Sequence, residues 1–292
     1  MPIDPRSAGP RPPFSHQQPL TPPGHTGDMD PRPDHGETSY QGSGQLQGRK
    51  ALITGGDSGI GRAVALAFAR EGADVLISYL EEESRDAQET MDLVKAEGRK
   101  AIGVPGDIRE EHHCETLVER AVQELGGIDI LVNNAAYQMS HASLEEISGE
   151  EFDRTFRTNV YATFFLSKAA ARQMPPGGSI INTVSINADK PNQTLVAYAA
   201  TKGALQNLTG GMAQLLADKG IRVNCVAPGP IWTPLIPSTL DIDSARSFGK
   251  QVPLKRPGQP CEVAPAFVLL ASDRGSYISG ATVAVTGGVP LI

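Results

Sequence analysis

Two side chains able to move protons, Tyr198 and Lys202, lie four residues apart in the sequence. In a helix predicted over 197–217, this spacing places them on one face, one turn apart. A tyrosine normally has a pKa near ~10, and a neighbouring ammonium group favours the phenolate and lowers that pKa. The tyrosine could then exchange a proton with a hydroxyl or carbonyl group at neutral pH. An ordinary surface pair has the same spacing, so the spacing alone leaves both interpretations open.

Ser185 favours the chemical interpretation of this pair. It follows an apolar strand predicted over 179–184, and α/β sheets bind their ligands at the carboxyl ends of the strands. Its hydroxyl group could donate a hydrogen bond to a substrate oxygen and hold that oxygen beside Tyr198.

A glycine-rich turn provides a candidate cofactor site. It reads Thr54-Gly55-Gly56-Asp57-Ser58-Gly59-Ile60-Gly61 and lies between a predicted strand and a predicted helix. Glycines let the backbone approach a pyrophosphate, and the N-terminus of the helix offers free N–H groups and a positive dipole end. An ordinary tight turn is the alternative. We expect Asp57 to cap the helix or to face solvent rather than to act as a catalytic carboxylate.

Strand and helix patterns alternate from Arg49 onward. Apolar runs predict strands over 51–54, 75–77, 101–104, 128–132, 179–184, 221–226 and 282–286. Helical periodicity predicts helices over 60–68, 81–97, 117–125, 152–171, 197–217 and 262–270. This alternation predicts an α/β fold, a doubly wound parallel sheet of Rossmann type in a single domain.

A polar, proline-bounded stretch over 228–260 interrupts this alternation. We expect its residues 231–256 to form a lid over the substrate. Trp232 could either line the substrate pocket or anchor this lid.

Residues 1–47 differ in composition from the rest of the chain, because they hold ten of its 23 prolines. Such a segment cannot bury enough apolar surface to order itself. We therefore divide the chain into an irregular N-terminal extension, residues 1–47, and a catalytic domain, residues 48–292. The extension could be disordered, but we expect residues 20–47 to lie extended on the body, with Tyr40 and Leu46 as anchors.

Taken together, these motifs resemble those of the short-chain dehydrogenase/reductase family. Gly55, Gly59 and Gly61 match its T-G-x-x-x-G-x-G pattern, and Asn133-Asn134-Ala135-Ala136 is similar to its N-N-A-G, with alanine in place of the last glycine. The resemblance covers residues 48–290. Within the family, the chain resembles a subgroup described as general stress proteins or as glucose/ribitol-dehydrogenase-like. The segments that carry this resemblance are the Pro/Gly-rich leader, the glycine turn and residues 227–234.

The resemblance implies an oxidoreductase that transfers a hydride between NAD or NADP and an alcohol, polyol, aldehyde or ketone. It implies that the catalytic residues are Tyr198 as general acid/base, Lys202 on the nicotinamide ribose, Ser185 on the substrate oxygen, and Asn159 holding a water. Its implied cofactor contacts are Gly55, Asp57, Ser58, Gly59, Ile60, Gly61, Tyr79, Asp107, Ile108, Asn134, Ala135, Ala136, Tyr198, Lys202, Pro228, Gly229, Ile231 and Thr233. A nucleotide-binding sensor without turnover is the alternative, and isomerase or epimerase chemistry ranks below both.

The end of the second strand bears on the choice between NAD and NADP. Tyr79 and Leu80 provide neither the acid typical of NAD-dependent relatives nor the base typical of NADP-dependent ones. The acids at 81–83 would oppose a 2′-phosphate, whereas Arg62 and Arg85 could support one. Each surface charge contributes about 1 kcal/mol, so we expect a slight preference for NAD.

Composition narrows the remaining possibilities. The net charge is −7 without a long basic run, which argues against nucleic acid. Apolar runs stay below the roughly 18 residues of a membrane helix, and the N-terminus lacks the apolar region of a secretory signal. We therefore expect a cytoplasmic protein with a small-molecule substrate.

The cysteines and histidines suggest no metal site. Cys114, Cys225 and Cys261 are far apart in the sequence, which argues against a disulfide framework and against zinc. We expect three reduced thiols, and we place His112-His113-Cys114 on a helix surface.

The expected assembly is a homotetramer. The family resemblance implies contacts through the helices that carry Asn159 and Tyr198 and through the C-terminal strand. The helix predicted over 152–171 has apolar side chains on more than one face, which fits a buried interface.

Overall fold

A parallel sheet forms the centre of the molecule. The computed structural model describes residues 3–291, and within them seven strands pair in the order β3-β2-β1-β4-β5-β6-β7. Every neighbouring pair is parallel. The strands are β1 Lys50–Thr54, β2 Asp74–Tyr79, β3 Ala101–Pro105, β4 Ile130–Asn133, β5 Ser179–Thr183, β6 Arg222–Pro228 and β7 Thr282–Val285. Strand order reverses between β1 and β4, where such sheets form a ligand crevice. The predicted doubly wound sheet of Rossmann type is confirmed.

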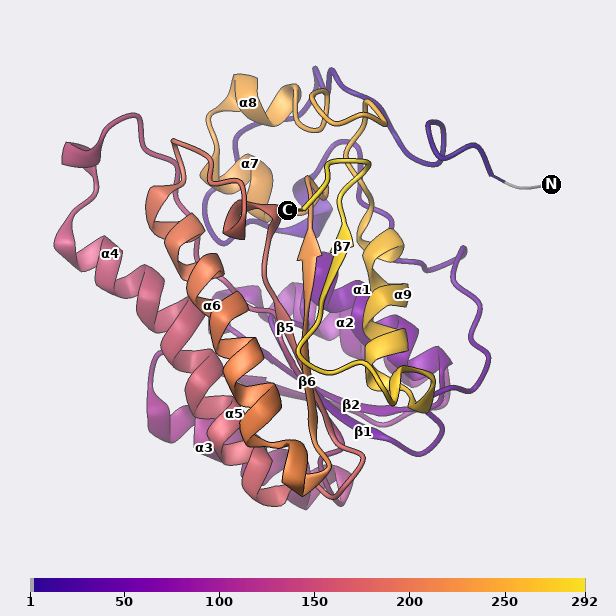
Figure 1. Ribbon diagram of the computed structural model, residues 1–292. Helices are drawn as coiled ribbons and strands as arrows, with labels where there is room; N and C mark the ends of the chain where they lie inside the picture. The colour runs from indigo at the N-terminus through magenta and orange to yellow at the C-terminus, as the bar shows by residue number, and fades with distance from the viewer. Residues whose placement is uncertain (1–2, 292) are drawn as a thin grey trace.

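Helices cover both faces of the sheet (Figure 1). One face carries α1 Gly59–Arg70, α2 Ser84–Ala96 and α9 Pro260–Ala271, and the other carries α3 Glu111–Leu125, α5 Ala162–Gln173 and α6 Val196–Leu215. None of the helices in the described part of the chain is both long and apolar enough to span a lipid bilayer.

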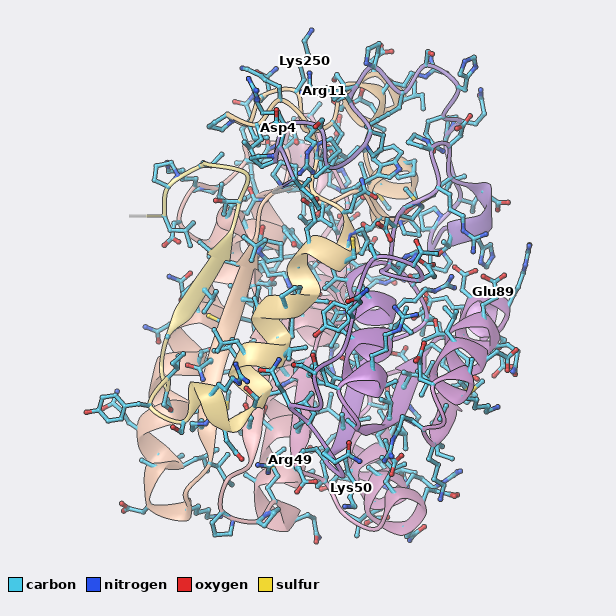
Figure 2. The ribbon with its side chains drawn as sticks, turned by 90° about the vertical axis from the view of Figure 1, so that its right-hand side faces the viewer. Asp4, Arg11, Arg49, Lys50, Glu89 and Lys250 are labelled. Atoms are coloured by element: carbon cyan, nitrogen blue, oxygen red, sulfur yellow. The ribbon has the colours of Figure 1, made fainter. Side chains whose placement is uncertain are left out.

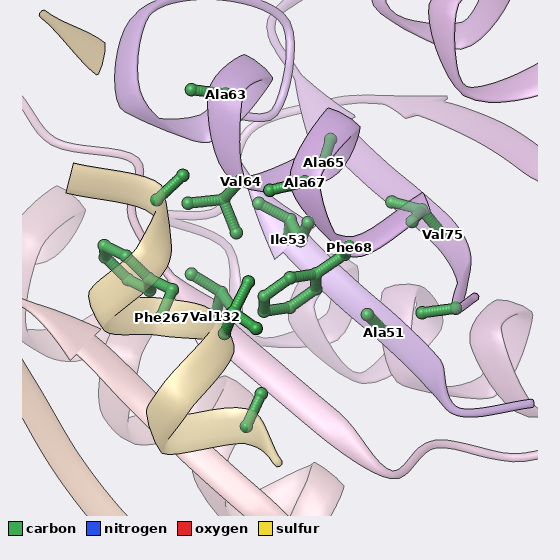
Figure 3. Close-up of a cluster of buried hydrophobic side chains, with 14 of the residues drawn as sticks. Ala51, Ile53, Ala63, Val64, Ala65, Ala67, Phe68, Val75, Val132 and Phe267 are labelled. Atoms are coloured by element: carbon green, nitrogen blue, oxygen red, sulfur yellow. The ribbon is translucent and has the colours of Figure 1, made fainter. Parts of the chain in front are cut away.

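β1 shows how one strand contributes to both layers of the core. Leu52 packs in the layer beneath α3 and α5, whereas Ala51 and Ile53 pack in the layer beneath α1 and α9. Successive side chains of a strand point to opposite faces, so a strand covered on both sides is apolar throughout. Figure 3 shows Phe68 of α1 beside Ile53, and both belong to one buried cluster with Phe267 of α9. Full burial of such a side chain contributes about 1.5–3 kcal/mol.

The helix expected over 152–171 is longer and less regular than predicted. It begins earlier because Ser148 Oγ accepts the N–H of Glu151 at 3.1 Å and caps the first turn. A π-helical turn, Arg157–Tyr161, then separates α4 Gly149–Phe156 from α5. The periodicity used to predict the helix assumes 3.6 residues per turn throughout, so it does not identify a wider turn within it.

Two further segments differ locally from the prediction. The stretch over 228–260 contains two short helices, α7 Leu235–Thr239 and α8 Ile242–Arg246. The helix expected over 81–97 begins instead with a 3-10 turn at Glu81–Glu83, before α2.

The N-terminal extension follows the body as an extended chain. Figure 2 places Asp4 and Arg11 at the same end of the molecule as Lys250, and Arg49 and Lys50 at the opposite end. The extension therefore passes along the whole molecule before β1 begins.

Both expected anchors of the extension make contacts. The buried carboxylate of Glu71 accepts the Tyr40 hydroxyl group at 2.6 Å and the N–H groups of Ser43 and Gln45 at 2.9 Å each. Leu46 is fully buried in the core beside α1. The extended docking that the sequence analysis expected is confirmed at these two positions.

Candidate active site

A cavity of about 860 Å³ lies at the carboxyl ends of the strands. It is lined by these predicted site residues: Gly55, Asp57, Ser58, Gly59, Ile60, Tyr79, Asp107, Ile108, Asn134, Ala135, Ala136, Ser185, Tyr198, Lys202, Pro228, Gly229, Ile231 and Thr233. Gly61 and Asn159 lie behind its wall. The structure thus brings segments that are far apart in the sequence to one cavity.

The glycine turn has the shape that a pyrophosphate requires. A Cβ atom at Gly61 would lie 1.8 Å from the carbonyl oxygen of Gly55, so only glycine fits there. Gly55 and Gly59 have φ angles of +60° and +49°, which other L residues rarely adopt. Because α1 begins at Gly59, its first-turn N–H groups and positive dipole end lie at the cavity. These residues therefore fit the dinucleotide that the sequence analysis expected.

The loop after β4 is fastened to this glycine turn. Asn134 Nδ2 donates to the carbonyl oxygens of Thr54 and Gly55 at 3.1 and 3.0 Å. The N–H groups of Asn134 and Ala135 donate to Thr54 Oγ1 at 3.0 and 3.1 Å. Asn134 is thus a positioning residue that holds two walls of the cavity together.

Tyr198, Lys202 and Ser185 converge at the other side of the cavity. Lys202 Nζ lies 5.3 Å from the centroid of the Tyr198 ring and donates to the carbonyl oxygen of Thr183 at 2.7 Å. The Tyr198 hydroxyl group is hydrogen-bonded to Ser185. The Ser185 hydroxyl group also accepts the N–H of Asn187 at 3.1 Å, which fixes its position at the end of β5.

Burial dominates the protonation of this pair. It raises the pKa of Tyr198 to about 12, although the hydrogen bond with Ser185 opposes the change. It also lowers the pKa of Lys202 to about 7. The expectation that Lys202 lowers the pKa of Tyr198 is therefore wrong for this structure, because weakly polar surroundings disfavour both charged forms. The neutral phenol is the resting form, and it can donate a proton.

Asn159 lies in the π-helical turn and is buried. Its Oδ1 accepts the N–H of Tyr137 at 2.7 Å, and its Nδ2 donates to the Tyr137 carbonyl oxygen at 3.0 Å and to Thr201 Oγ1 at 2.9 Å. Thr201 Oγ1 in turn donates to the carbonyl oxygen of Tyr198 at 2.6 Å. Asn159 therefore links the loop after β4 to α6. The bound water that the resemblance implies for it stays a prediction.

Asp57 is buried within the glycine turn, with 2% of its surface exposed. Ser58 holds the N-cap position of α1, so the expectation that Asp57 caps the helix or faces solvent is wrong. The carbonyl oxygen of Asp57 accepts Arg62 Nε and Thr90 Oγ1 at 2.8 Å each, which holds this part of the turn inward. Burial raises the pKa of the Asp57 carboxyl group to about 6.

The end of β2 forms the part of the cavity where an adenosine ribose is expected. Tyr79, Leu80, Glu82 and Glu83 line it. Glu83 accepts the N–H of Leu80 at 2.8 Å. Burial, reinforced by the charge of Asp57, raises the pKa of Glu83 to about 8. Glu83 is thus mostly uncharged at neutral pH and opposes a 2′-phosphate less than the acidic run suggested.

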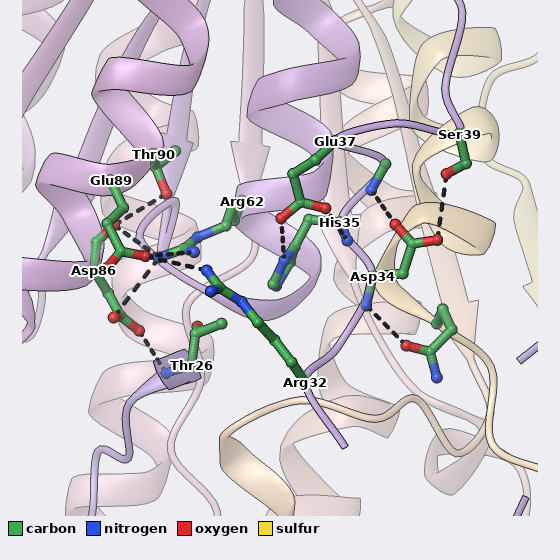
Figure 4. A network of polar contacts seen from close by, with 12 residues as sticks. Thr26, Arg32, Asp34, His35, Glu37, Ser39, Arg62, Asp86, Glu89 and Thr90 are labelled. Atoms are coloured by element: carbon green, nitrogen blue, oxygen red, sulfur yellow. Dashed lines mark hydrogen bonds and ion pairs between the residues drawn. The ribbon is translucent and has the colours of Figure 1, made fainter. Parts of the chain in front are cut away.

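The two arginines considered as supports for NADP do not line this cavity. Arg62 is fully buried, donates to the Asp86 carbonyl oxygen at 2.9 Å and contacts Glu89 Oε2 at 3.2 Å (Figure 4). Arg85 is exposed beside Glu89. Arg62 therefore joins α1 to α2, and the support for a 2′-phosphate expected from it is wrong.

Several side chains that line the cavity were missed by the sequence analysis. They are Gln138 after β4, Asn187, Lys190 and Asn192 after β5, Arg109 after β3, and Pro22 and Pro23 of the extension. The rule that ligands bind at the carboxyl ends of strands could have found all but the two prolines. Arg109 Nε donates to Asp107 Oδ2 at 2.7 Å and so pairs with the acid expected near the adenine.

Trp232 anchors the lid and does not line the cavity. It is fully buried, with its ring centroid 4.4 Å from that of Phe14. Its Nε1 donates to the carbonyl oxygen of Pro31 at 2.6 Å. Of the two interpretations left open, the structure supports the anchor.

The His112-His113-Cys114 segment is only partly on the surface. His112 is exposed, whereas Cys114 is fully buried and its thiol donates to the Ile108 carbonyl oxygen at 3.1 Å. The surface position expected for Cys114 is therefore wrong. Across residues 3–291, no group of three or more His, Cys, Asp and Glu side chains is arranged to hold a metal ion. Cys114, Cys225 and Cys261 are free thiols.

Comparison with known proteins agrees with this architecture. The family model described as Enoyl-(Acyl carrier protein) reductase matches residues 55–290. General stress protein 39 of Bacillus subtilis (strain 168) is 51% identical over 266 residues, which cover 91% of this chain and 93% of that protein. Glucose and ribitol dehydrogenase of Daucus carota is 45% identical over 280 residues, which cover 94% of this chain and 96% of that protein. Both agree with the subgroup suggested by the leader and the motifs.

A solved structure shares the fold and carries a cofactor. It is a short chain dehydrogenase from Burkholderia cenocepacia J2315 in complex with NADP, with a TM-score of 0.79 and 35% identity, covering 84% of this chain and 98% of that one. The expected preference for NAD gains no support from this match. The family model, both relatives and the solved structure each match most of this chain. The chain therefore belongs to the short-chain dehydrogenase/reductase family and is an NAD(P)-dependent oxidoreductase.

Proposed function

We propose that the protein interconverts an alcohol or polyol with its aldehyde or ketone, with Tyr198 as the proton-exchanging residue. The observation that carries this proposal is the convergence of Tyr198, Ser185 and Lys202 on one wall of the cavity. A nicotinamide cofactor, when bound, supplies or accepts the hydride at the carbon that bears the oxygen.

The residues of the chain perform the proton half of the reaction. Ser185 donates a hydrogen bond to the substrate oxygen and holds it next to Tyr198. In the reducing direction, the Tyr198 O–H bond breaks as the carbonyl oxygen gains the proton and becomes a hydroxyl group. A Lys202 ammonium then stabilises the phenolate that remains, because opposite charges attract strongly in a buried site. Oxidation of an alcohol runs the same transfer backwards.

Residues on the cofactor side would hold the dinucleotide. The N-terminus of α1 and the glycine turn suit the pyrophosphate, Asp107 and Ile108 the adenine, and Tyr79 the adenosine ribose. We propose that both NAD and NADP bind, because uncharged Glu83 weakens the expected opposition to a 2′-phosphate.

The lining around Tyr198 favours a polyhydroxylated substrate. Gln138, Asn187, Lys190 and Asn192 all line the cavity, and each can donate hydrogen bonds to hydroxyl groups. Gln138 already donates to Thr239 Oγ1 at 2.9 Å, so Asn187, Lys190 and Asn192 carry the preference: an apolar substrate that covered them would remove water without offering a partner, at about 1–3 kcal/mol for each group buried in this way. The relative from Daucus carota, named glucose and ribitol dehydrogenase, is consistent with this class.

Replacement of Tyr198 by phenylalanine tests the proposal, because it removes one oxygen and keeps the ring. We expect Tyr198→Phe to bind NADPH as the wild type does and to lose at least a hundredfold in kcat, the lower end of general acid catalysis at about 10²–10⁴. The assay follows NADPH absorbance with sugars, polyols, aldehydes and ketones. Retention of more than a tenth of wild-type kcat would refute the role of Tyr198. A wild type that binds NADPH and converts none of these compounds would favour the sensor.

We also propose a homotetramer in the cytoplasm. Phe152 of α4, Tyr161 of the π-helical turn and Phe164 of α5 are 43–47% exposed, and exposed aromatic patches commonly mark interfaces. Tyr277, close before β7, is fully exposed, which supports a second contact near the C-terminal strand. Free thiols at three positions suit a reducing compartment.

A further inference from the structure

Part of the N-terminal extension forms a wall of the active-site cavity. This part, residues 20–27, is called the strap below. Its Pro22 and Pro23 line the same cavity as the glycine turn and Tyr198. Prolines have a fixed φ angle and lack an N–H group, so they present a stiff, apolar surface to whatever fills the cavity.

One side of the strap is attached to α2. The N–H of Thr26 donates to Asp86 Oδ2 at 2.8 Å, and both residues are buried. Asp86 lies three residues after Glu83, which lines the adenosine end of the cavity, and its Oδ1 lies 3.7 Å from Arg62 Nη2. Figure 4 shows Thr26 joined through Asp86 to the buried network around Arg62. The strap is therefore fixed beside the adenosine end.

The other side of the strap is attached to the lid. Gly24 lies so close to it that a Cβ atom there would be 3.0 Å from the carbonyl oxygen of Pro234. The N–H of Leu20 donates to the carbonyl oxygen of Pro237 at 2.9 Å. Pro234 follows Thr233, whose side chain lies against Gly59 of the glycine turn. The strap thus extends from the end of β2 to the start of the lid, past the glycine turn.

We propose that the strap closes the outer side of the cofactor site, with Pro22 and Pro23 against the adenosine diphosphate half of the dinucleotide. This inference rests on the proposed function, since it requires that NAD(P) fills the cavity. The dinucleotide then lies between the glycine turn on the inside and the strap on the outside. It leaves the site only when the contacts of the strap with α2 or with the lid are broken.

A matched pair of glycine variants tests the contact with the lid. Gly24 and Gly44 both belong to the extension and have φ angles of +79° and +77°, so alanine strains the backbone equally at both. At Gly24 the new methyl group meets Pro234, whereas at Gly44 it meets nothing within 4 Å. We expect Gly24→Ala to raise the dissociation rate constant of NADPH at least fivefold, and Gly44→Ala to leave it within twofold of the wild type. Stopped-flow NADPH fluorescence measures this rate.

A second variant tests the contact with α2. Thr26→Pro removes the N–H that binds Asp86, and it suits the backbone because Thr26 is the first residue of a 3-10 turn and His25 before it is extended, at φ −116° and ψ 142°. We expect the same increase in the NADPH dissociation rate. Hydrogen exchange supplies an independent readout, because bound NADPH should slow the exchange of the Leu20 and Thr26 amides in the wild type.

The outcomes separate the strap from the proposed function. If the wild type binds NADPH, but Gly24→Ala and Thr26→Pro release it at rates within twofold of that of Gly44→Ala, the proposed role of the strap is wrong and the proposed function stands. Unchanged exchange of the Leu20 and Thr26 amides on NADPH binding also overturns it. If the two variants melt at lower temperatures but release NADPH at the wild-type rate, the strap stabilises the fold and does not close the cofactor site. A wild type that binds neither NADPH nor NADH overturns the proposed function and the strap together.

Discussion

Protonation of Lys202 should set the pH range in which the protein reduces a carbonyl compound. Lys202 is buried, its Nζ donates to the Thr183 carbonyl oxygen at 2.7 Å, and burial lowers its pKa to about 7. Burial raises the pKa of Tyr198 to about 12. Below pH 7 the site therefore holds a phenol that can give up a proton and an ammonium that can stabilise the resulting phenolate. Above pH 7 the phenol persists and the ammonium is lost.

The size of the effect follows from the two pKa values. Each pH unit above the pKa of Lys202 lowers the charged fraction tenfold, which corresponds to about 1.4 kcal/mol. Between pH 7, where half of Lys202 is charged, and pH 9 the rate of carbonyl reduction should therefore fall roughly fiftyfold. Alcohol oxidation should stay nearly level over the same range, because the phenolate that accepts its proton becomes tenfold more abundant with each pH unit while the Lys202 ammonium that stabilises it becomes tenfold rarer. The two directions thus differ in their pH dependence.

Single-turnover reduction by NADPH-loaded protein, followed by absorbance from pH 6 to pH 9, measures this effect. Lys202→Met is the control variant, because it removes the titrating amine and keeps a long apolar side chain. We expect the variant to reduce slowly at all pH values, without the decline above pH 7. A wild-type rate that stays level up to pH 9 would refute the reasoning, as would a decline above pH 7 that persists in Lys202→Met.

Two further predictions concern the cofactor and the assembly. Burial, with the charge of Asp57, raises the pKa of Glu83 to about 8, so Glu83 gains charge between pH 7 and pH 9. The ratio of kcat/KM for NADP to that for NAD should therefore fall over this range, up to roughly tenfold for one added charge close to a 2′-phosphate. Glu83→Gln should abolish the change, and an unchanged slope in this variant would exclude Glu83 as its source. Light scattering should give the mass of four chains at micromolar concentration, and Phe164→Glu, on the exposed side of α5, should shift it to smaller species; a monomeric wild type would contradict the interface.

The sequence was sufficient for the parts of the site that depend on local pattern. Ala51, Leu52 and Ile53 are apolar in succession, which identified a strand covered on both faces, and the glycine turn that follows marked its carboxyl end. The carboxyl ends of parallel strands lie at one edge of a sheet, and this placed Ser185 at the same edge as Gly55. The four-residue spacing of Tyr198 and Lys202 fixed their common helix face. Each step used residues within a few positions of one another, where chain geometry alone determines the outcome.

Electrostatic behaviour could not be predicted in the same way, because it depends on how much solvent the whole fold excludes. The sequence places an ammonium near the Tyr198 phenol but does not say how deeply both are buried. In the structure burial outweighs the attraction between the two groups. It raises the pKa of Tyr198 to about 12 and lowers the pKa of Lys202 to about 7. Arg62 is a similar case. Its charge suggested phosphate binding, yet the fold uses it between the Asp57 carbonyl oxygen and α2.

The docking of the extension was the hardest feature to derive, because its partners are far away in the sequence. Pro31 contacts Trp232, about two hundred residues later, and Phe14 packs on the same ring. The extension has little apolar surface of its own, so it can become ordered only on surfaces that the body has already formed. It is held by a few side chains, such as Phe14 and Leu46, and by single hydrogen bonds such as that of Thr26. Segments held in this way open locally at a lower cost than global unfolding. The strap can therefore lift from the cofactor site while the sheet and the catalytic residues stay folded.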